Sequence, residues 1–240
     1  IKTWLFTGLR PTPELSFAVR LLNATTGIVV IASHNPPQYN GYKVYWSDGG
    51  QVISPQDKAI VSEVRSVTSI TSIAREEALA RGLLVMIDRE VDEPFLDMIT
   101  RQSLRPRLVK ERGGDMTVIY TPLCGAGGMP VERALKGLGI EVTFVDEQRR
   151  PDGSFPTLTY PNPKEASALK LAIDLARKRK AALVMATDPD ADRLGIAVPD
   201  KKGDFVLVTG NQLGVLLLDY IVSSRSELGT MPANPVFMKT

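Results

Sequence analysis

The sequence has very few of the side chains that bind soft metals or form covalent cross-links. Its 240 residues include one cysteine, Cys124, and one histidine, His34. A single cysteine excludes an internal disulfide framework and a cysteine-based zinc site, and a single histidine excludes a multi-histidine metal centre. Any metal ion that this chain binds must therefore be held by oxygen ligands.

Long apolar runs and a strong excess of one charge are also missing. No apolar run approaches the roughly 18 residues of a membrane-spanning helix, and the N-terminus lacks the apolar stretch and cleavage site of a signal peptide. The net charge is only +2, which gives no general attraction to nucleic acid or to an anionic membrane. We expect a soluble, cytoplasmic protein without nucleic-acid or membrane partners, as a monomer or a weak homodimer.

The length and composition are those of a folded protein with about two domains. Hydrophobic residues make up 43% of the chain and charged residues 23%, as in ordinary globular proteins. Strand and helix patterns alternate along the sequence, which predicts an α/β fold of consecutive domains with helices on both faces of mixed sheets. Neither end shows the polar residues usual at a domain terminus, so we expect a piece of a longer chain.

Several segments carry predictions about the architecture. Residues 27–32 form a continuous apolar run rich in β-branched residues, which predicts a buried parallel strand. A second strand is predicted over residues 42–46, and two short buried strands over 182–186 and 194–198. The charged, broken stretch 105–114 is typical of a linker between two domains.

Capping signals predict where three helices begin. Thr12 is the expected N-cap of a helix with Pro13 at its first position, and Asn162 opens a near capping box ahead of Pro163. Thr209 and Gln212 complete a capping box for a helix over residues 213–222.

The most informative segment is the acidic loop, residues 188–193. Asp188, Asp190 and Asp192 alternate along an extended backbone, so their carboxylates project to one side and repel each other strongly. Arg193 alone does not neutralise them, whereas Mg²⁺ or Ca²⁺ would, with Mn²⁺ as a substitute. An EF-hand is excluded because glycine and glutamate are missing at its sixth and twelfth positions. A solvated acidic turn is the alternative interpretation.

A second candidate loop, residues 33–37, follows the predicted strand 27–32. The carboxyl end of a strand in an open α/β sheet is where ligands and reactive groups collect. Ser33 is a candidate nucleophile, while His34 and the loop amides could hold an anion. Lys43 on the next strand could reach back as a base or a phosphate contact. A turn serine and a structural histidine are the alternative.

Together the two loops resemble those of the α-D-phosphohexomutase superfamily, which includes phosphoglucomutases, phosphomannomutases and phosphopentomutases. The resembling segments are Ala32-Ser33-His34-Asn35-Pro36, Tyr39-Asn40-Gly41-Tyr42-Lys43 and Asp188-Pro189-Asp190-Ala191-Asp192-Arg193, in matching order and separation. Members have four domains with mixed-sheet α/β folds. The resemblance assigns residues 1–91 to part of the first domain, 92–208 to the second and 209–240 to the start of the third.

The resemblance also implies a role for each candidate residue. Ser33 would carry the phosphoryl group, and an oxygen of that group would complete a Mg²⁺ site made by the three aspartates Asp188, Asp190 and Asp192. Lys43 would be the acid or base, and the phosphate would be supported by His34 and Arg193.

The implied reaction interconverts a hexose 1-phosphate and a hexose 6-phosphate through a sugar bisphosphate, with glucose 1,6-bisphosphate as activator. Glucose is the expected sugar because residues 39–46 look most like the phosphoglucomutase and phosphopentomutase branch. A phosphomannomutase, a phosphopentomutase, a metal-dependent phosphatase and a non-catalytic binding protein on the same scaffold are the alternatives.

The sequence departs from the family pattern in two ways. Cys124 stands where the family's Thr-Pro-Leu-His-Gly segment has histidine. The sugar-specificity loop of the third domain, the phosphate-binding loop of the fourth and an early N-terminal Gly/Arg motif are absent from these residues. We therefore expect residues 1–240 alone to be inactive.

Overall fold

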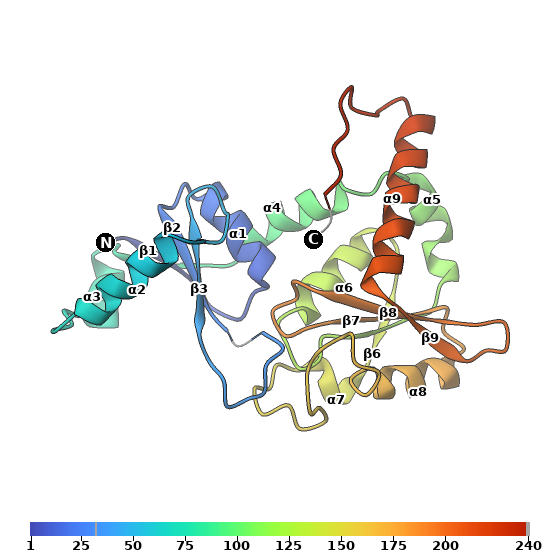
Figure 1. Ribbon diagram of the computed structural model, residues 1–240, viewed down its shortest axis with the longest axis horizontal. Coiled ribbons are helices and arrows are strands. Elements are labelled where there is room, and N and C mark those ends of the chain that lie inside the picture. The colour runs from blue at the N-terminus through green and yellow to red at the C-terminus, as the bar shows by residue number, and fades with distance from the viewer. Residues whose placement is uncertain (32, 239–240) are drawn as a thin grey trace.

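The computed structural model describes residues 1–31 and 33–238 as an α/β structure (Figure 1). Among these residues the strands form three sheets. The strands are β1 (Thr3–Phe6), β2 (Thr26–Val30), β3 (Tyr42–Trp46), β4 (Leu84–Ile87), β5 (Val118–Thr121), β6 (Val142–Phe144), β7 (Leu183–Thr187), β8 (Leu194–Pro199) and β9 (Phe205–Val208). The helices are α1 (Thr12–Leu21), α2 (Gln56–Ser66), α3 (Arg75–Ala80), α4 (Arg89–Thr100), α5 (Pro106–Arg112), the 3₁₀ helix η1 (Gly113–Asp115), α6 (Gly128–Gly137), α7 (Asp146–Arg149), α8 (Lys170–Arg179) and α9 (Gly210–Glu227). The expected fold class, a mixed α/β arrangement, is confirmed.

The C-terminal half is built on a five-stranded sheet of order β6-β5-β7-β8-β9. Strands β6, β5 and β7 run parallel, while β8 and β9 continue the sheet antiparallel. All four residues of β5 are buried, as expected for a central parallel strand covered on both faces. Helix α8 turns Ala172, Ile173 and Ala176 into the core against this sheet. This sheet therefore provides a rigid base for the loops at its edge.

The N-terminal half contains two separate two-stranded sheets. Strand β1 pairs parallel with β4, and β2 pairs antiparallel with β3. Helix α1 packs on β2 and on α4, with Ala18 buried against Ile87 and Val91. Helix α4 also packs on α6 and so joins the two halves.

The prediction of a buried parallel strand over residues 27–32 is wrong in its pairing and its burial. Strand β2 ends at Val30 and runs antiparallel to β3, and Ile28 and Val30 are 58% and 69% exposed. A run of β-branched residues favours a strand but does not encode its partner. Ala32, the last residue of the predicted strand, lies outside the described residues.

Other boundaries also differ from the predictions. The expected linker 105–114 is largely helical, because Pro106 opens α5 and η1 follows directly. Turns separate Asn162 from α8, which begins only at Lys170. The capping box of Thr209 and Gln212 is confirmed and opens α9. Strands β4 and β9 were not anticipated. No helix in the described part of the chain is long and apolar enough to cross a membrane.

A buried carboxyl group lies where α1 faces α4. The side chain of Glu14 is 1% exposed, and neither of its oxygens has a hydrogen-bond partner among the described residues. Arg10 pairs instead with Asp92 and Asp88, at 2.7 and 2.8 Å, and its Nε is 3.9 Å from Glu14. Burial and the nearby carboxylate of Asp92 raise the pKa of Glu14 to about 8.

We predict that Glu14→Gln is more stable than the native protein at pH 8, and that this advantage is smaller at pH 5. In the native protein the free energy of unfolding should fall as the pH rises from about 4.5 to 8, because the folded state then holds a proton that the unfolded state has released. Glutamine has no such titration, so the variant should gain stability over the native protein steadily across this range, by about 1.4 kcal/mol for each pH unit. Urea unfolding at a series of pH values measures the gain.

Glu63→Gln on the exposed face of α2 is the matched control and should keep the native pH dependence. Equal pH dependence in Glu14→Gln and the native protein would show that Glu14 titrates normally.

Candidate functional site

The acidic loop connects β7 to β8 and concentrates three carboxylates. Asp188, Asp190 and Asp192 each offer one oxygen, and these oxygens all lie within 4.8 Å of one another. Asp188 and Asp190 are buried, and the side chain of Asp192 is 31% exposed. Ala191 between them adopts a left-handed backbone with φ of 52°, which turns the chain tightly enough to hold the three side chains together.

Ser33 enters the same space from the loop between β2 and β3. Its Oγ lies 3.4 Å from Oδ2 of Asp188 and 3.2 Å from Oδ1 of Asp190. The backbone of Ser33 also has a positive φ, 53°. Non-glycine residues rarely adopt this conformation, and those that do are concentrated at functional sites. Two loops separated by about 155 positions in the sequence therefore meet at one hydroxyl.

Lys43 approaches the cluster from β3. Its Nζ donates to Asp190 at 2.8 Å and to Asp192 at 3.2 Å. Burial lowers the pKa of Lys43, but the hydrogen bond and charge of Asp190 outweigh burial, and the net pKa is raised. The lysine is therefore an ammonium group at neutral pH.

His34 and Arg193 complete the ring around Ser33. The Nδ1 of His34 is 3.3 Å from the Ser33 Oγ, and its Nε2 is 3.4 Å from the Arg193 guanidinium. Burial and the positive charge of Arg193 lower the pKa of His34, so its ring is neutral at pH 7. All seven residues that the sequence singled out thus lie in one place.

The charges of the cluster are not balanced. Burial and the charges of Asp190 and Asp192 raise the pKa of Asp188 to about 7. Burial, the largest single influence, raises the pKa of Asp190, but the hydrogen bond and charge of Lys43 and the hydrogen bond from Thr12 together outweigh it and lower the pKa. Three close carboxylates, with one oxygen each within reach of a common centre, fit a hard divalent cation.

Three further residues support the acidic loop and were missed as site residues. The hydroxyl of Thr12 donates to Asp190 at 3.0 Å, and its amide donates to the Asp190 carbonyl at 2.9 Å. Thr12 was predicted to be the N-cap of α1, but it lies inside the helix and Pro11 occupies the cap. The hydroxyl is used for Asp190 instead of the helix end, and no local sequence signal indicates this.

Gly125 and Gly127 are the other two supporting residues. A Cβ on Gly125 would lie 2.2 Å from the Cα of Pro189, and one on Gly127 would lie 2.6 Å from the Thr187 hydroxyl oxygen. The predicted tight turn between strand and helix is therefore also a packing platform for the acidic loop. Buried Cys124 belongs to the same turn, and burial raises the pKa of its thiol.

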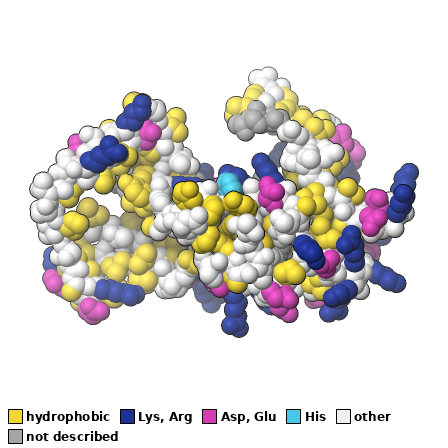
Figure 2. Space-filling view, turned by 60° about the horizontal axis from the view of Figure 1, so that its bottom comes forward, with side chains coloured by type: hydrophobic (Ala, Val, Ile, Leu, Met, Phe, Trp, Pro, Cys, Tyr) yellow, Lys and Arg dark blue, Asp and Glu magenta, His cyan; other side chains and the backbone are white. Residues whose placement is uncertain are grey.

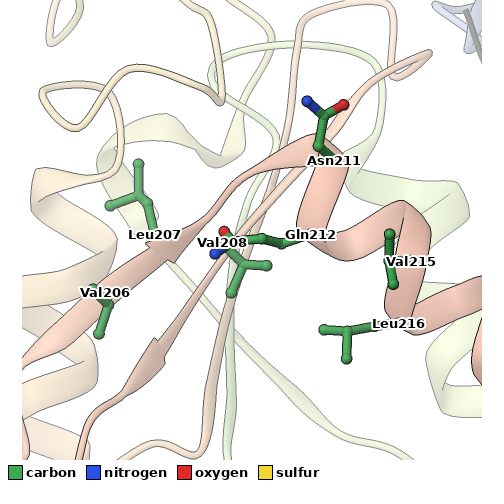
Figure 3. Close-up of a pocket in the computed structure, with 7 residues that line it drawn as sticks. All are labelled: Val206, Leu207, Val208, Asn211, Gln212, Val215 and Leu216. Atoms are coloured by element: carbon green, nitrogen blue, oxygen red, sulfur yellow. The ribbon is translucent and has the colours of Figure 1, made fainter.

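An apolar groove lies elsewhere, between β9 and the first turns of α9 (Figure 3). Its lining residues are Val206, Leu207, Val208, Asn211, Gln212, Val215 and Leu216. None of these side chains titrates near neutral pH, so the groove offers no acid, base or nucleophile. The chemistry of the described residues is concentrated at the acidic loop.

Family models cover most of the chain. Residues 1–71 match the model described as phosphoglucomutase/phosphomannomutase, alpha/beta/alpha domain I, and residues 93–203 match domain II of the same family. The chain belongs to the α-D-phosphohexomutase superfamily, which confirms the resemblance drawn from the two loops.

Particular relatives differ in the sugar for which they are named. A probable phosphomannomutase of Haemophilus influenzae is 37% identical over 98% of this chain, and a phosphoglucomutase of Staphylococcus aureus is 37% identical over 95%. The phosphopentomutase of Homo sapiens is 36% identical over 95%. The solved structure of a proposed phosphomannomutase from Thermus thermophilus superimposes over 93% of this chain with a TM-score of 0.75 and 28% identity.

The chain spans only part of these proteins. It covers 48%, 41% and 37% of the Haemophilus, Staphylococcus and human relatives, respectively, and 47% of the Thermus structure.

We predict that Gly125→Ala weakens divalent-cation binding at least tenfold. The added methyl group would overlap Pro189, so the acidic loop must shift and its carboxylates must separate. Calorimetric titration of the protein with Mn²⁺ or Mg²⁺ measures the change. Gly128→Ala is the matched control, because its nearest contact is an ordinary 3.5 Å. Equal cation affinities in the two variants would mean that the close contact between Gly125 and Pro189 does not determine the position of the acidic loop.

Proposed function

We propose that the full-length protein is a Mg²⁺-dependent phosphohexomutase, which interconverts hexose 1-phosphate and hexose 6-phosphate through a phosphoserine at Ser33. One observation carries this proposal: the Ser33 hydroxyl faces two carboxylates of the three-aspartate cluster, at 3.2 and 3.4 Å. A serine beside such a cluster can carry a phosphoryl group, because a cation held by the carboxylates would neutralise the negative charge of that group.

The chain's own residues would divide the work as follows. Phosphorylated Ser33 would present its phosphorus to a hydroxyl of the sugar phosphate. The bond from phosphorus to the Ser33 Oγ would break as the new bond to the sugar oxygen forms, which gives a sugar bisphosphate. The other phosphate of the reoriented sugar would then return to Ser33, so that the enzyme is regenerated and phosphate is conserved. Mg²⁺ bound by the three aspartates would neutralise charge on the transferring group.

The cationic residues would hold protons and position the phosphate. Lys43 is an ammonium group beside Asp190, so it would donate a proton to the departing Ser33 oxygen and recover the proton that the attacking sugar hydroxyl releases. On the return step the two proton transfers would run in the opposite direction. His34 is within reach of the Ser33 oxygen and Arg193 adjoins that ring, so both would contact a phosphate placed there.

Glucose is the sugar we propose, with glucose 1,6-bisphosphate as activator. Relatives of this chain are named phosphomannomutase, phosphoglucomutase and phosphopentomutase, so the relatives alone leave the sugar open. The proposal rests on the likeness of residues 39–46 to the phosphoglucomutase and phosphopentomutase branch. Comparing kcat/KM for the three kinds of sugar phosphate tests it.

Three other expectations stay predictions. They are the division of the chain at 1–91, 92–208 and 209–240, a cytoplasmic location, and a monomer or weak homodimer without a nucleic-acid partner. We also expect residues 1–240 to need the rest of the polypeptide for turnover.

We predict that Ser33→Ala abolishes phosphorylation of the full-length protein. Incubation with ³²P-labelled glucose 1,6-bisphosphate should label one peptide that contains Ser33, and mutase turnover should fall at least a thousandfold in the variant, because it lacks the phosphoryl-carrying oxygen. Peptide mapping and a coupled assay measure the two effects.

Ser62→Ala on the exposed surface of α2 is the control and should keep both label and activity. Steady release of inorganic phosphate, without sugar bisphosphate dependence, would indicate a phosphatase instead. Persistent labelling of Ser33→Ala would place the phosphoryl carrier elsewhere.

We predict opposite effects of Lys43→Met on cation binding and on turnover. The ammonium group occupies the space beside Asp190 and Asp192 and reduces their negative charge, so its removal should strengthen Mg²⁺ binding several-fold. The same change removes a proton donor and should lower kcat by a factor of about 10²–10⁴.

Calorimetry and steady-state kinetics on the full-length protein separate the effects, with Lys58→Met on α2 as the control. Weaker cation binding in Lys43→Met would contradict the competition that we describe.

A further inference from the structure

A buried carboxyl group without a hydrogen-bond donor lies where three helices meet. On the face seen in Figure 2, acidic and basic side chains project from the outline of the molecule into solvent. The side chain of Glu14 on α1 is instead 1% exposed, and neither of its oxygens has a partner among the described residues. Helix α4 packs on α1 and on α6, and so this group lies at the joint between the two halves. Burial of a carboxylate without a donor is strongly destabilising, which favours the neutral acid.

The cation closest to Glu14 among the described residues is already occupied. Arg10 donates from Nε and from one terminal nitrogen to Asp92, at 2.7 and 2.9 Å. The same terminal nitrogen donates to Asp88 at 2.8 Å, and the other donates to the carbonyl of Leu9 at 3.1 Å. The Arg10 Nε is 3.9 Å from Glu14, which is beyond hydrogen-bond distance. Two carboxyl groups therefore adjoin one guanidinium nitrogen, and only Asp92 is bonded to it.

A proton resolves this conflict. The charged groups around Glu14 come from three elements: Arg10 from the segment before α1, Asp88 and Asp92 from the start of α4, and Arg133 from α6, where Glu93 holds it at 2.7 Å. Burial is the largest influence and raises the pKa of Glu14 to about 8; Asp92 acts in the same direction, and the two arginines act against it. A neutral Glu14 can donate its proton to the Asp92 carboxylate, so that Arg10 stays where it is.

The first turn of α1 also carries a contact to the acidic loop. Thr12 donates its hydroxyl to the Asp190 carboxylate at 3.0 Å and its amide to the Asp190 carbonyl at 2.9 Å. Pro11 and Pro13 flank Thr12 and fix the φ angles on both sides of it. The amide of Glu14 donates to the Pro11 carbonyl at 3.0 Å and closes the turn. Thr12 is therefore held in a stiff segment that moves with Glu14.

We propose that Glu14, in its protonated form, is a positioning residue for the acidic loop. The neutral carboxyl group leaves Arg10 on Asp92, and the first turn of α1 then keeps Thr12 on Asp190. Loss of the proton to solvent would place a second buried carboxylate beside the guanidinium. The two carboxylates would compete for Arg10, the start of α1 would shift, and the hold on the acidic loop would weaken.

The expected dependence on pH is opposite to that of the cluster itself. A rise in pH removes protons from the three aspartates and so favours a bound cation. The same rise ionises Glu14 and weakens the support of the loop, which disfavours the cation. Because Glu14→Gln keeps a neutral side chain of the same shape, this variant should lose only the unfavourable part. A role of Glu14 in packing alone would not change with pH.

Amide exchange of Thr12 in the cation-free, full-length protein is the first test. Thr12 should exchange at the same rate in the native protein and in Glu14→Gln at pH 6.5, and at least about threefold faster in the native protein at pH 9. Comparison of two proteins at one pH cancels the intrinsic dependence of exchange on pH. Glu63→Gln on α2 is the matched control and should follow the native protein. Equal Thr12 rates in the native protein and Glu14→Gln at pH 9 would overturn the proposal.

Mg²⁺ binding to the full-length protein is the second test, and it rests on the proposed function. Between pH 6.5 and pH 9 the affinity of the native protein, relative to that of Glu14→Gln, should fall about fivefold or more in calorimetric titrations. A ratio that does not change with pH would overturn the proposal. Failure of both proteins to bind Mg²⁺ would contradict the proposed cation site instead, and the exchange of Thr12 would still decide the role of Glu14.

Discussion

The structure at the site depends on keeping three carboxylates together. Asp188, Asp190 and Asp192 repel one another at short range, and burial of two of them makes the repulsion stronger than in water. The partners that offset it come from both halves: Lys43 and Thr12 from the first, and the backbone amide of Arg193 from the second. The carboxylates therefore form a contact between the halves, and any change in their charge acts on that contact.

Residue types and spacing predicted which reactive side chains lie together at the site, but not the residues that support them. The alternating aspartates and the Ser33 loop stand out because charge and turn residues are local signals. Thr12 carries no such signal, since an N-cap threonine and a threonine that donates to a distant carboxylate look alike in sequence. Gly125 was recognised as part of a turn, but only the fold reveals that Pro189 fills the space where its side chain would be.

Prediction of the fold from the sequence was limited for the same reason: local signals indicate an element but not its distant partners. The capping box at Thr209 was predicted correctly because all its partners lie within four residues. Strand β2 was predicted at nearly the right place, yet with the wrong partner, because pairing depends on segments far away in the chain. The charged stretch before Gly113 looked like a linker, but Pro106 opens a helix there, with Lys110 and Arg112 in its last turn. Propensity decides such an element only when tertiary contacts do not.

The candidate site lies where a loop from one half meets a loop from the other. Each half ends a strand at a loop that turns into an antiparallel neighbour, and each loop is held by a left-handed residue, Ser33 in one and Ala191 in the other. One loop offers a hydroxyl and the other offers carboxylates, so neither half alone supplies both kinds of group. Because the two loops meet within 3.2 Å, small rotations of one half against the other would separate them. Helix α4, which packs on α1 and α6, is placed to resist that rotation. The precision of the site is therefore set by the contacts between the halves, and the sequence of either loop is not sufficient to produce it.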